Sequence, residues 1–121
     1  MTRKILVVDD DEDIRESMVD FLTQEGYLAV GMHGGQQALS HLAWAALPDV
    51  ILLDLVMPGM TGVQVRAELG KNPRLSAIPV VICSGDGVPP ALRASVFGVL
   101  QKPFDLDGLF AMVKSACESR I

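Results

Sequence analysis

Short apolar runs alternate with amphipathic segments along the whole chain. Ile5–Val8 and Val50–Leu53 are unbroken apolar runs that each end at an aspartate, a pattern typical of strands buried on both faces of a parallel sheet. Weaker strand patterns cover residues 27–32, 78–83 and 99–100. Between these runs apolar residues recur at helical spacing, which predicts five helices, at residues 13–26, 38–46, 63–69, 91–97 and 106–117.

Strands that alternate with helices in this way predict an α/β fold. Right-handed helical crossovers between parallel strands place helices on both faces of the sheet. The chain has no internal repeat and no segment with the composition of a linker, so we expect one domain over residues 1–121. In such sheets ligands bind beyond the carboxyl ends of the strands, and functional residues are expected there.

Composition and charge narrow the class of protein. Half of the residues are apolar and 21% are charged, as in a folded globular domain. The net charge of −5, without a basic run, argues against direct binding to nucleic acid. No apolar stretch is long enough to cross a bilayer and the start of the chain lacks a signal-peptide layout, so we expect no membrane contact.

The two cysteines indicate the cellular compartment in which the protein is expected. Cys83 and Cys117 lie within apolar patterns and lack the spacing of a metal or redox motif, so we interpret them as reduced, packed thiols. A reducing cytoplasm suits such thiols, and we expect the protein there. Trp44 is likewise interpreted as a packing residue.

Polar side chains follow four of the predicted strands. They are Asp9, Asp10 and Asp11 after the first strand, Asp54 after the third, Ser84 after the fourth and Lys102 after the fifth. Carboxylates gathered at one sheet edge either take up protons or bind a hard cation such as Mg²⁺. Lys102 could then pair with a phosphoryl oxygen while Ser84 donates a hydrogen bond to another. The set suits transfer of a phosphoryl group to a carboxylate.

Each of these residues also has an ordinary structural explanation. An aspartate after a strand is most often a turn former or a helix N-cap, and Asp11 stands at such a position. The segment Ser84–Gly87 could be a plain turn. The structural explanation requires independent coincidences at the ends of four strands, and we therefore favour a shared site.

At these positions the chain resembles the receiver domain of two-component response regulators. The resemblance covers essentially the whole chain and rests on the segments Ile5–Asp10, Asp54–Gly62, Ser84–Gly85 and Lys102–Phe104. It implies a flavodoxin-like, doubly wound sheet with strand order 2-1-3-4-5. It also implies a signalling phosphoacceptor rather than a metabolic enzyme, with only self-catalysed phosphotransfer and dephosphorylation.

The resemblance assigns roles to individual residues. Asp54 would be the phosphoacceptor, and Asp9, Asp10, Asp54 and the backbone carbonyl of Val56 would hold Mg²⁺. Ser84 would be the switch hydroxyl and Lys102 the cation that pairs with the phosphate. The peptide bond before Pro103 is expected to be cis, as is usual in the family.

Three departures from the family pattern concern the switch. Ser84 stands where Thr is commoner, a mild change that keeps the hydroxyl. The segment from Ser84 to Lys102 is shorter than in typical receivers, which predicts a shortened helix at 91–97. Val99 occupies the position, three residues before Lys102, where many receivers carry Tyr or Phe as a switch aromatic. We expect an intact phosphorylation site whose coupling to the surface is atypical.

The resemblance also implies partners. The donor would be a sensor histidine kinase or a histidine phosphotransfer protein, and the output a contact with a downstream protein, because no effector domain follows residue 117. The face formed by the segments 91–97, 99–100 and 106–117 is the candidate dimer surface.

Three rival hypotheses remain at this point. The chain could be a receiver cut from a hybrid kinase or a longer regulator, or a degenerate receiver that serves as a binding scaffold. A phosphatase-type hydrolase would need an Asp-x-Asp pair, and Val56 stands where its second acid belongs.

Overall fold

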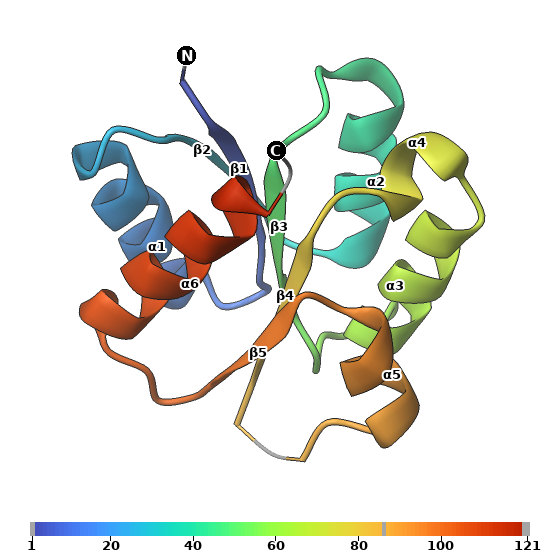
Figure 1. The fold of residues 1–121 in the computed structure, drawn as a ribbon. Coiled ribbons are helices and arrows are strands. Elements are labelled where there is room, and N and C mark those ends of the chain that lie inside the picture. The colour runs from blue at the N-terminus through green and yellow to red at the C-terminus, as the bar shows by residue number, and fades with distance from the viewer. Residues whose placement is uncertain (1, 86, 120–121) are drawn as a thin grey trace.

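The computed structural model describes residues 2–85 and 87–119. In this part of the chain, five parallel strands form one sheet in the order β2-β1-β3-β4-β5 (Figure 1). The strands are β1 Lys4–Val8, β2 Leu28–Met32, β3 Val50–Asp54, β4 Val80–Ser84 and β5 Gly98–Gln101. Strand order reverses between β1 and β3, so a crevice is expected where the chain leaves these two strands.

Helices cover both faces of the sheet, as Figure 1 shows. α1 Glu12–Gln24 and α6 Leu106–Glu118 pack on one face, and α2 Gly35–Trp44, α3 Gly62–Gly70, α4 Pro73–Ser76 and α5 Pro90–Ser95 pack on the other. None of the helices in the described residues is long and apolar enough to cross a membrane.

The core consists of two apolar layers, one on each side of the sheet. Leu6 and Val8 of β1 contribute to the layer under α2, α3, α4 and α5. Ile5 and Val7 contribute to the layer under α1 and α6. Neighbouring residues of a strand point to opposite faces, and both faces are covered. That is why the central strands appear in the sequence as unbroken apolar runs.

The structure confirms the α/β fold and its strand order and corrects the number of helices. A sixth, one-turn helix, α4, lies before β4. Asn72 starts it by accepting a hydrogen bond from the backbone N–H of Arg74, and Pro73 occupies its first turn, where the missing N–H of proline costs nothing. So short a helix lacks the apolar repeat by which longer helices are predicted.

Other element boundaries move by a few residues. α5 ends at Ser95 rather than at residue 97, and β5 extends from Gly98 to Gln101. Asp54 and Ser84 are the last residues of their strands rather than the first residues of loops. The interpretation of Trp44 as a packing residue was wrong, because 91% of this residue is exposed at the end of α2.

Candidate functional site

Three aspartates meet where the sheet changes direction. One carboxylate oxygen from each of Asp9, Asp10 and Asp54 lies within 4.8 Å of the others. Asp9 and Asp54 are buried, at 2% and 7% exposure, whereas Asp10 is exposed. The carboxyl ends of β1 and β3 bring these residues together, because the two strands are parallel neighbours in register from Ile5 with Val50 onward.

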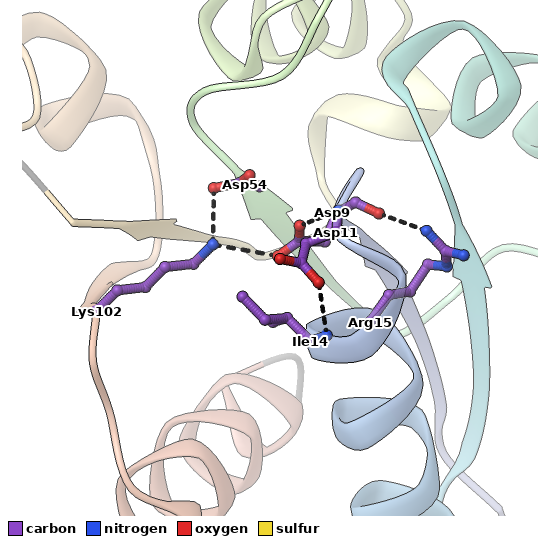
Figure 2. Close-up of polar contacts among 6 residues, drawn as sticks. All are labelled: Asp9, Asp11, Ile14, Arg15, Asp54 and Lys102. Carbon is purple, nitrogen blue, oxygen red and sulfur yellow. Dashed lines mark hydrogen bonds and ion pairs between the residues drawn. The ribbon is translucent and has the colours of Figure 1, made fainter.

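Lys102 links two of the carboxylates. Its Nζ atom donates to Asp9 Oδ2 at 3.2 Å and to Asp54 Oδ1 at 3.1 Å (Figure 2). The Lys102 backbone N–H donates to the Ser84 carbonyl at 2.7 Å, and the peptide bond to Pro103 is cis, as expected. One ammonium therefore offsets the repulsion between two buried acids.

The third aspartate of the run, Asp11, has a structural role. Its Oδ1 atom accepts a hydrogen bond from the Ile14 N–H at 3.1 Å and so caps α1. Its own N–H donates to Asp9 Oδ1 at 2.9 Å. Both contacts are visible in Figure 2. The helix-cap explanation is thus correct for Asp11, and the backbone N–H of the same residue holds the Asp9 carboxylate in place.

The loop after β3 is closed at both of its ends. The Leu55 N–H donates to the Cys83 carbonyl at 3.1 Å, and the Gly62 N–H donates to the Leu55 carbonyl at 2.9 Å. Thr61 then starts α3 with a capping box. Val56, whose carbonyl was predicted to bind metal, lies within this loop with 73% of the residue exposed.

The charges of the site are coupled. Burial raises the pKa of the Asp54 carboxyl group and the charge of Asp9 raises it further, while the hydrogen bond and charge of Lys102 only partly offset these effects. For Lys102, burial acts to lower the pKa, but the hydrogen bond and charge of Asp54, together with Asp9, outweigh it and leave the pKa above its usual value. A divalent cation beside the carboxylates would relieve the same repulsion.

The two predicted switch residues lie on the neighbouring strands. Ser84 is 3% exposed at the carboxyl end of β4. Val99 pairs with Ile82 across β4 and β5 and is partly buried against the layer under α5. The structure brings Ser84 to the edge that holds the acids, whereas Val99 lies three residues back along β5 from Lys102.

Sequence reasoning did not single out Arg15. Its Nη1 atom donates to the Asp9 carbonyl at 2.9 Å (Figure 2). The available signal was Gly31, because a glycine inside a strand often marks the close approach of another group. At Gly31 that group is the methylene stem of Arg15.

The sequence model of the response regulator receiver domain matches residues 5–114. The chain belongs to the response regulator receiver domain family. The response regulator PleD of Caulobacter vibrioides is 39% identical over 120 residues, and the transcriptional regulator NtrC of Escherichia coli is 34% identical over 116 residues.

Solved receiver structures superpose on the whole fold. CheY4 of Vibrio cholerae has a TM-score of 0.87 at 26% identity, with 96% of this chain and 99% of that chain covered. The receiver domain of a histidine kinase from Syntrophus aciditrophicus has a TM-score of 0.89 at 26% identity, with 98% and 92% covered. Receivers thus occur both as single domains and within larger signalling proteins.

The curated relatives are much longer than this receiver. The alignment with PleD covers 95% of this chain and 26% of PleD, and that with NtrC covers 93% and 24%. Receivers are signalling phosphoacceptors that interact with histidine kinases and downstream effectors, and they generally bind Mg²⁺ at a cluster of aspartates. Family membership and the intact acidic cluster do not favour the degenerate scaffold or the hydrolase.

Proposed function

We propose that this receiver accepts a phosphoryl group on Asp54 from a phosphohistidine donor. Asp9 is the nearest rival, because it is also buried and also paired with Lys102. Both oxygens of Asp9 accept hydrogen bonds, from Lys102 and from the Asp11 N–H. Of the two carboxylate oxygens of Asp54, only Oδ1 accepts a hydrogen bond within the described part of the chain. The other oxygen, Oδ2, accepts none there, and this supports Asp54 as the nucleophile.

The reaction is a direct displacement at phosphorus. An oxygen of the Asp54 carboxylate attacks the phosphorus, the P–N bond of the phosphohistidine breaks, and the departing imidazole keeps the electron pair and takes a proton from solvent. The product is an acyl phosphate on Asp54. Lys102 already contacts Asp54, so its ammonium can exchange the carboxylate for a phosphoryl oxygen with little movement.

Ser84 is proposed to respond to the phosphorylation of Asp54. It ends β4, next to the strand that carries Asp54, and its carbonyl is tied to the Lys102 N–H. A hydroxyl at this position can donate to a phosphoryl oxygen. Attraction of Ser84 and Lys102 to the same phosphate would then pull on the ends of β4 and β5 together.

The acidic cluster fits a magnesium ion. Asp9, Asp10 and Asp54 supply oxygen ligands close together, which Mg²⁺ prefers, and the exposure of Asp10 leaves room for bound water. The carbonyl of Val56 is proposed as a further ligand. A bound Mg²⁺ would neutralise charge between the incoming phosphate and the carboxylates.

NMR spectra test this metal site. Asp10→Asn should weaken the Mg²⁺-dependent shifts of backbone amides at residues 9–11 and 54–56. An acidic cluster that shows no such shifts in the wild type would contradict the site.

Labelling experiments test the phosphoacceptor. Acetyl phosphate with Mg²⁺ should phosphorylate the wild type and Asp11→Asn, because asparagine also caps a helix, but not Asp54→Asn. The label should be lost at alkaline pH and in hydroxylamine, as expected of an acyl phosphate. An acid-stable label, or one that persists in Asp54→Asn, would point to another residue.

A protein donor is supported by the surface beside Lys102. An apolar cavity of about 420 Å³ lies next to it, lined mainly by residues of α1 and of the segment that follows β5, among them Ile14, Phe104 and Leu106. A histidine kinase or a histidine phosphotransfer protein that delivers phosphate to Asp54 must cover this surface. Apolar contact there would hold the donor in place.

One pair of variants tests this donor contact. Leu106 lines the cavity and is 51% exposed, and Leu28 of β2 is 50% exposed and lies outside it. Leu106→Asp should slow phosphotransfer from the kinase found by profiling the histidine kinases of the source organism, but not from acetyl phosphate. Leu28→Asp should slow neither reaction. Equal slowing of kinase transfer by both changes would refute a donor contact at the cavity.

The output surface is proposed to be the face formed by α5, β5 and α6, for a downstream protein or for a second copy of the receiver. Phe97 is 40% exposed between α5 and β5. Val99 cannot sweep the volume of an aromatic ring, because its side chain is short and its χ1 angle is stiff. The coupling of this face to Asp54 should therefore be weaker than in receivers with the aromatic switch.

A further inference from the structure

A partly buried hydrogen bond connects α1 to the backbone of the acidic cluster. Arg15 lies one turn into α1, and its backbone N–H donates to the Asp11 carbonyl at 2.9 Å. Its guanidinium turns back toward the strand, where Nη1 donates to the Asp9 carbonyl at 2.9 Å. Figure 2 shows this contact on the side of Asp9 opposite Lys102. Arg15 thus reaches the site without touching any of the carboxylates.

The carbonyl that Arg15 holds belongs to the peptide bond between Asp9 and Asp10. Because a peptide unit is planar, fixing this carbonyl also fixes the nitrogen and Cα atoms of Asp10, from which its side chain leaves the backbone. The Asp9 carboxylate has Lys102 and the Asp11 N–H to hold it. The Asp10 carboxylate is exposed and accepts no hydrogen bond within the described residues, so its direction depends on the backbone.

Gly31 of β2 makes room for the arginine. A Cβ atom at this position would lie 3.0 Å from both Cγ and Cδ of Arg15 and 3.3 Å from Cγ2 of Val19. These distances are shorter than ordinary contacts, so a side chain at position 31 would force the methylene stem of Arg15 to shift by a few tenths of an ångström. Because Gly31 has no side chain, the methylene stem of Arg15 can pass close to β2 at this position and the guanidinium can reach the Asp9 carbonyl.

We propose that Arg15 is a positioning residue for the acidic cluster and that Gly31 gives it the space to act. The inference rests on the proposed binding of Mg²⁺ by Asp9, Asp10 and Asp54. Arg15 acts through the backbone and directs the Asp10 carboxylate toward the Mg²⁺ position that the Asp9 and Asp54 carboxylates also face. Groups that orient metal ligands in this way typically account for a 10- to 100-fold change in metal affinity.

The sign of the effect separates this role from a simple charge effect. Arg15 is a cation near three carboxylates, and by Coulomb's law alone its removal should strengthen the binding of Mg²⁺. Loss of positioning should weaken binding instead. A purely structural role in α1 would lower stability and leave the Mg²⁺ affinity of the folded protein unchanged.

The experiment is a Mg²⁺ titration of the folded receiver, followed by calorimetry and by amide chemical shifts. Arg15→Met keeps the apolar stem and removes the charge and the donors. Arg15→Lys keeps the charge and one donor group, and Gly31→Ala keeps the guanidinium but displaces it. Arg74→Met changes the net charge equally from α4, outside the site.

The expected dissociation constant for Mg²⁺ is about tenfold higher in Arg15→Met, with smaller increases in Arg15→Lys and Gly31→Ala and no change in Arg74→Met. An unchanged or lower constant in Arg15→Met would overturn the inference. If that variant does not fold, Gly31→Ala decides the question by the same criterion. Absence of Mg²⁺ binding in the wild type would instead refute the proposed function.

Discussion

Gly62 is the position where a single methyl group should disturb the phosphoacceptor most directly. It is the first residue of α3, and its N–H donates to the Leu55 carbonyl at 2.9 Å. A Cβ atom on Gly62 would lie 2.6 Å from the Asp54 carbonyl oxygen and 2.9 Å from the Cα atom of Leu55. Both atoms belong to the backbone, so neither can rotate away as a flexible side chain could.

The size of the effect follows from these distances. Ordinary contact begins at 3.4 Å, so the methyl group of Gly62→Ala is about 0.8 Å too close to the Asp54 oxygen in a closely packed region. Overpacking of this kind costs about 3 kcal/mol at the upper end of its range. Alanine recovers at most about 1 kcal/mol through its better helix propensity. We expect Gly62→Ala to lower the free energy of unfolding by about 2 kcal/mol.

Urea denaturation followed by circular dichroism measures this loss. Gly87→Ala is the matched control, because a Cβ atom on Gly87 meets no atom within 4 Å. Gly62→Ala should also accept phosphate from acetyl phosphate more slowly while still folded, because the shift displaces the backbone that carries Asp54. If Gly62→Ala differs from Gly87→Ala by less than about 0.5 kcal/mol, the steric reasoning is wrong.

Three further predictions concern Asp54, Cys83 and Val99. Burial and the charge of Asp9 raise the pKa of Asp54, so its ionisation costs stability above that pKa; Asp54→Asn should resist urea better than the wild type at neutral pH, and this advantage should shrink as the pH falls through the Asp54 pKa. A pH-independent difference would contradict this. Burial raises the pKa of the Cys83 thiol to about 12, so a thiol reagent should label Cys83 only after unfolding, and fast labelling of the folded protein would disprove its burial. Val99→Tyr should enlarge the chemical-shift changes that beryllofluoride causes in α5 and β5, whereas equally large changes in the wild type would show that the aromatic ring is dispensable.

Much of the fold and the place of the candidate site could be predicted because the signals are local. Apolar runs such as Val50–Leu53 reveal strands buried on both faces, since each residue of such a strand meets a covered surface. An acid directly after a buried strand must lie at the sheet edge, and parallel strands send all such acids to the same edge. The meeting of Asp9, Asp54 and Lys102 at one edge could therefore be predicted before any distance was known.

The extent of burial at the margins of the fold was not predictable in this way. Trp44 closes an apolar helical pattern, yet 91% of the residue is exposed because α2 ends there, beyond the layer that covers the sheet.

The one-turn helix α4 could not be predicted either. Its position is set by a cap at Asn72 and by neighbouring residues rather than by an apolar repeat.

The sequence by itself determined which groups reach the sheet edge, and only the tertiary structure decided how they pair. Lys102 and Asp9 are 93 positions apart yet in contact, and the same ammonium also reaches Asp54. Side-chain reach decided that Arg15 holds the Asp9 carbonyl rather than a carboxylate. Periodicity and turn chemistry are properties of neighbouring residues, whereas these contacts depend on distances that exist only once the strands and helices have packed.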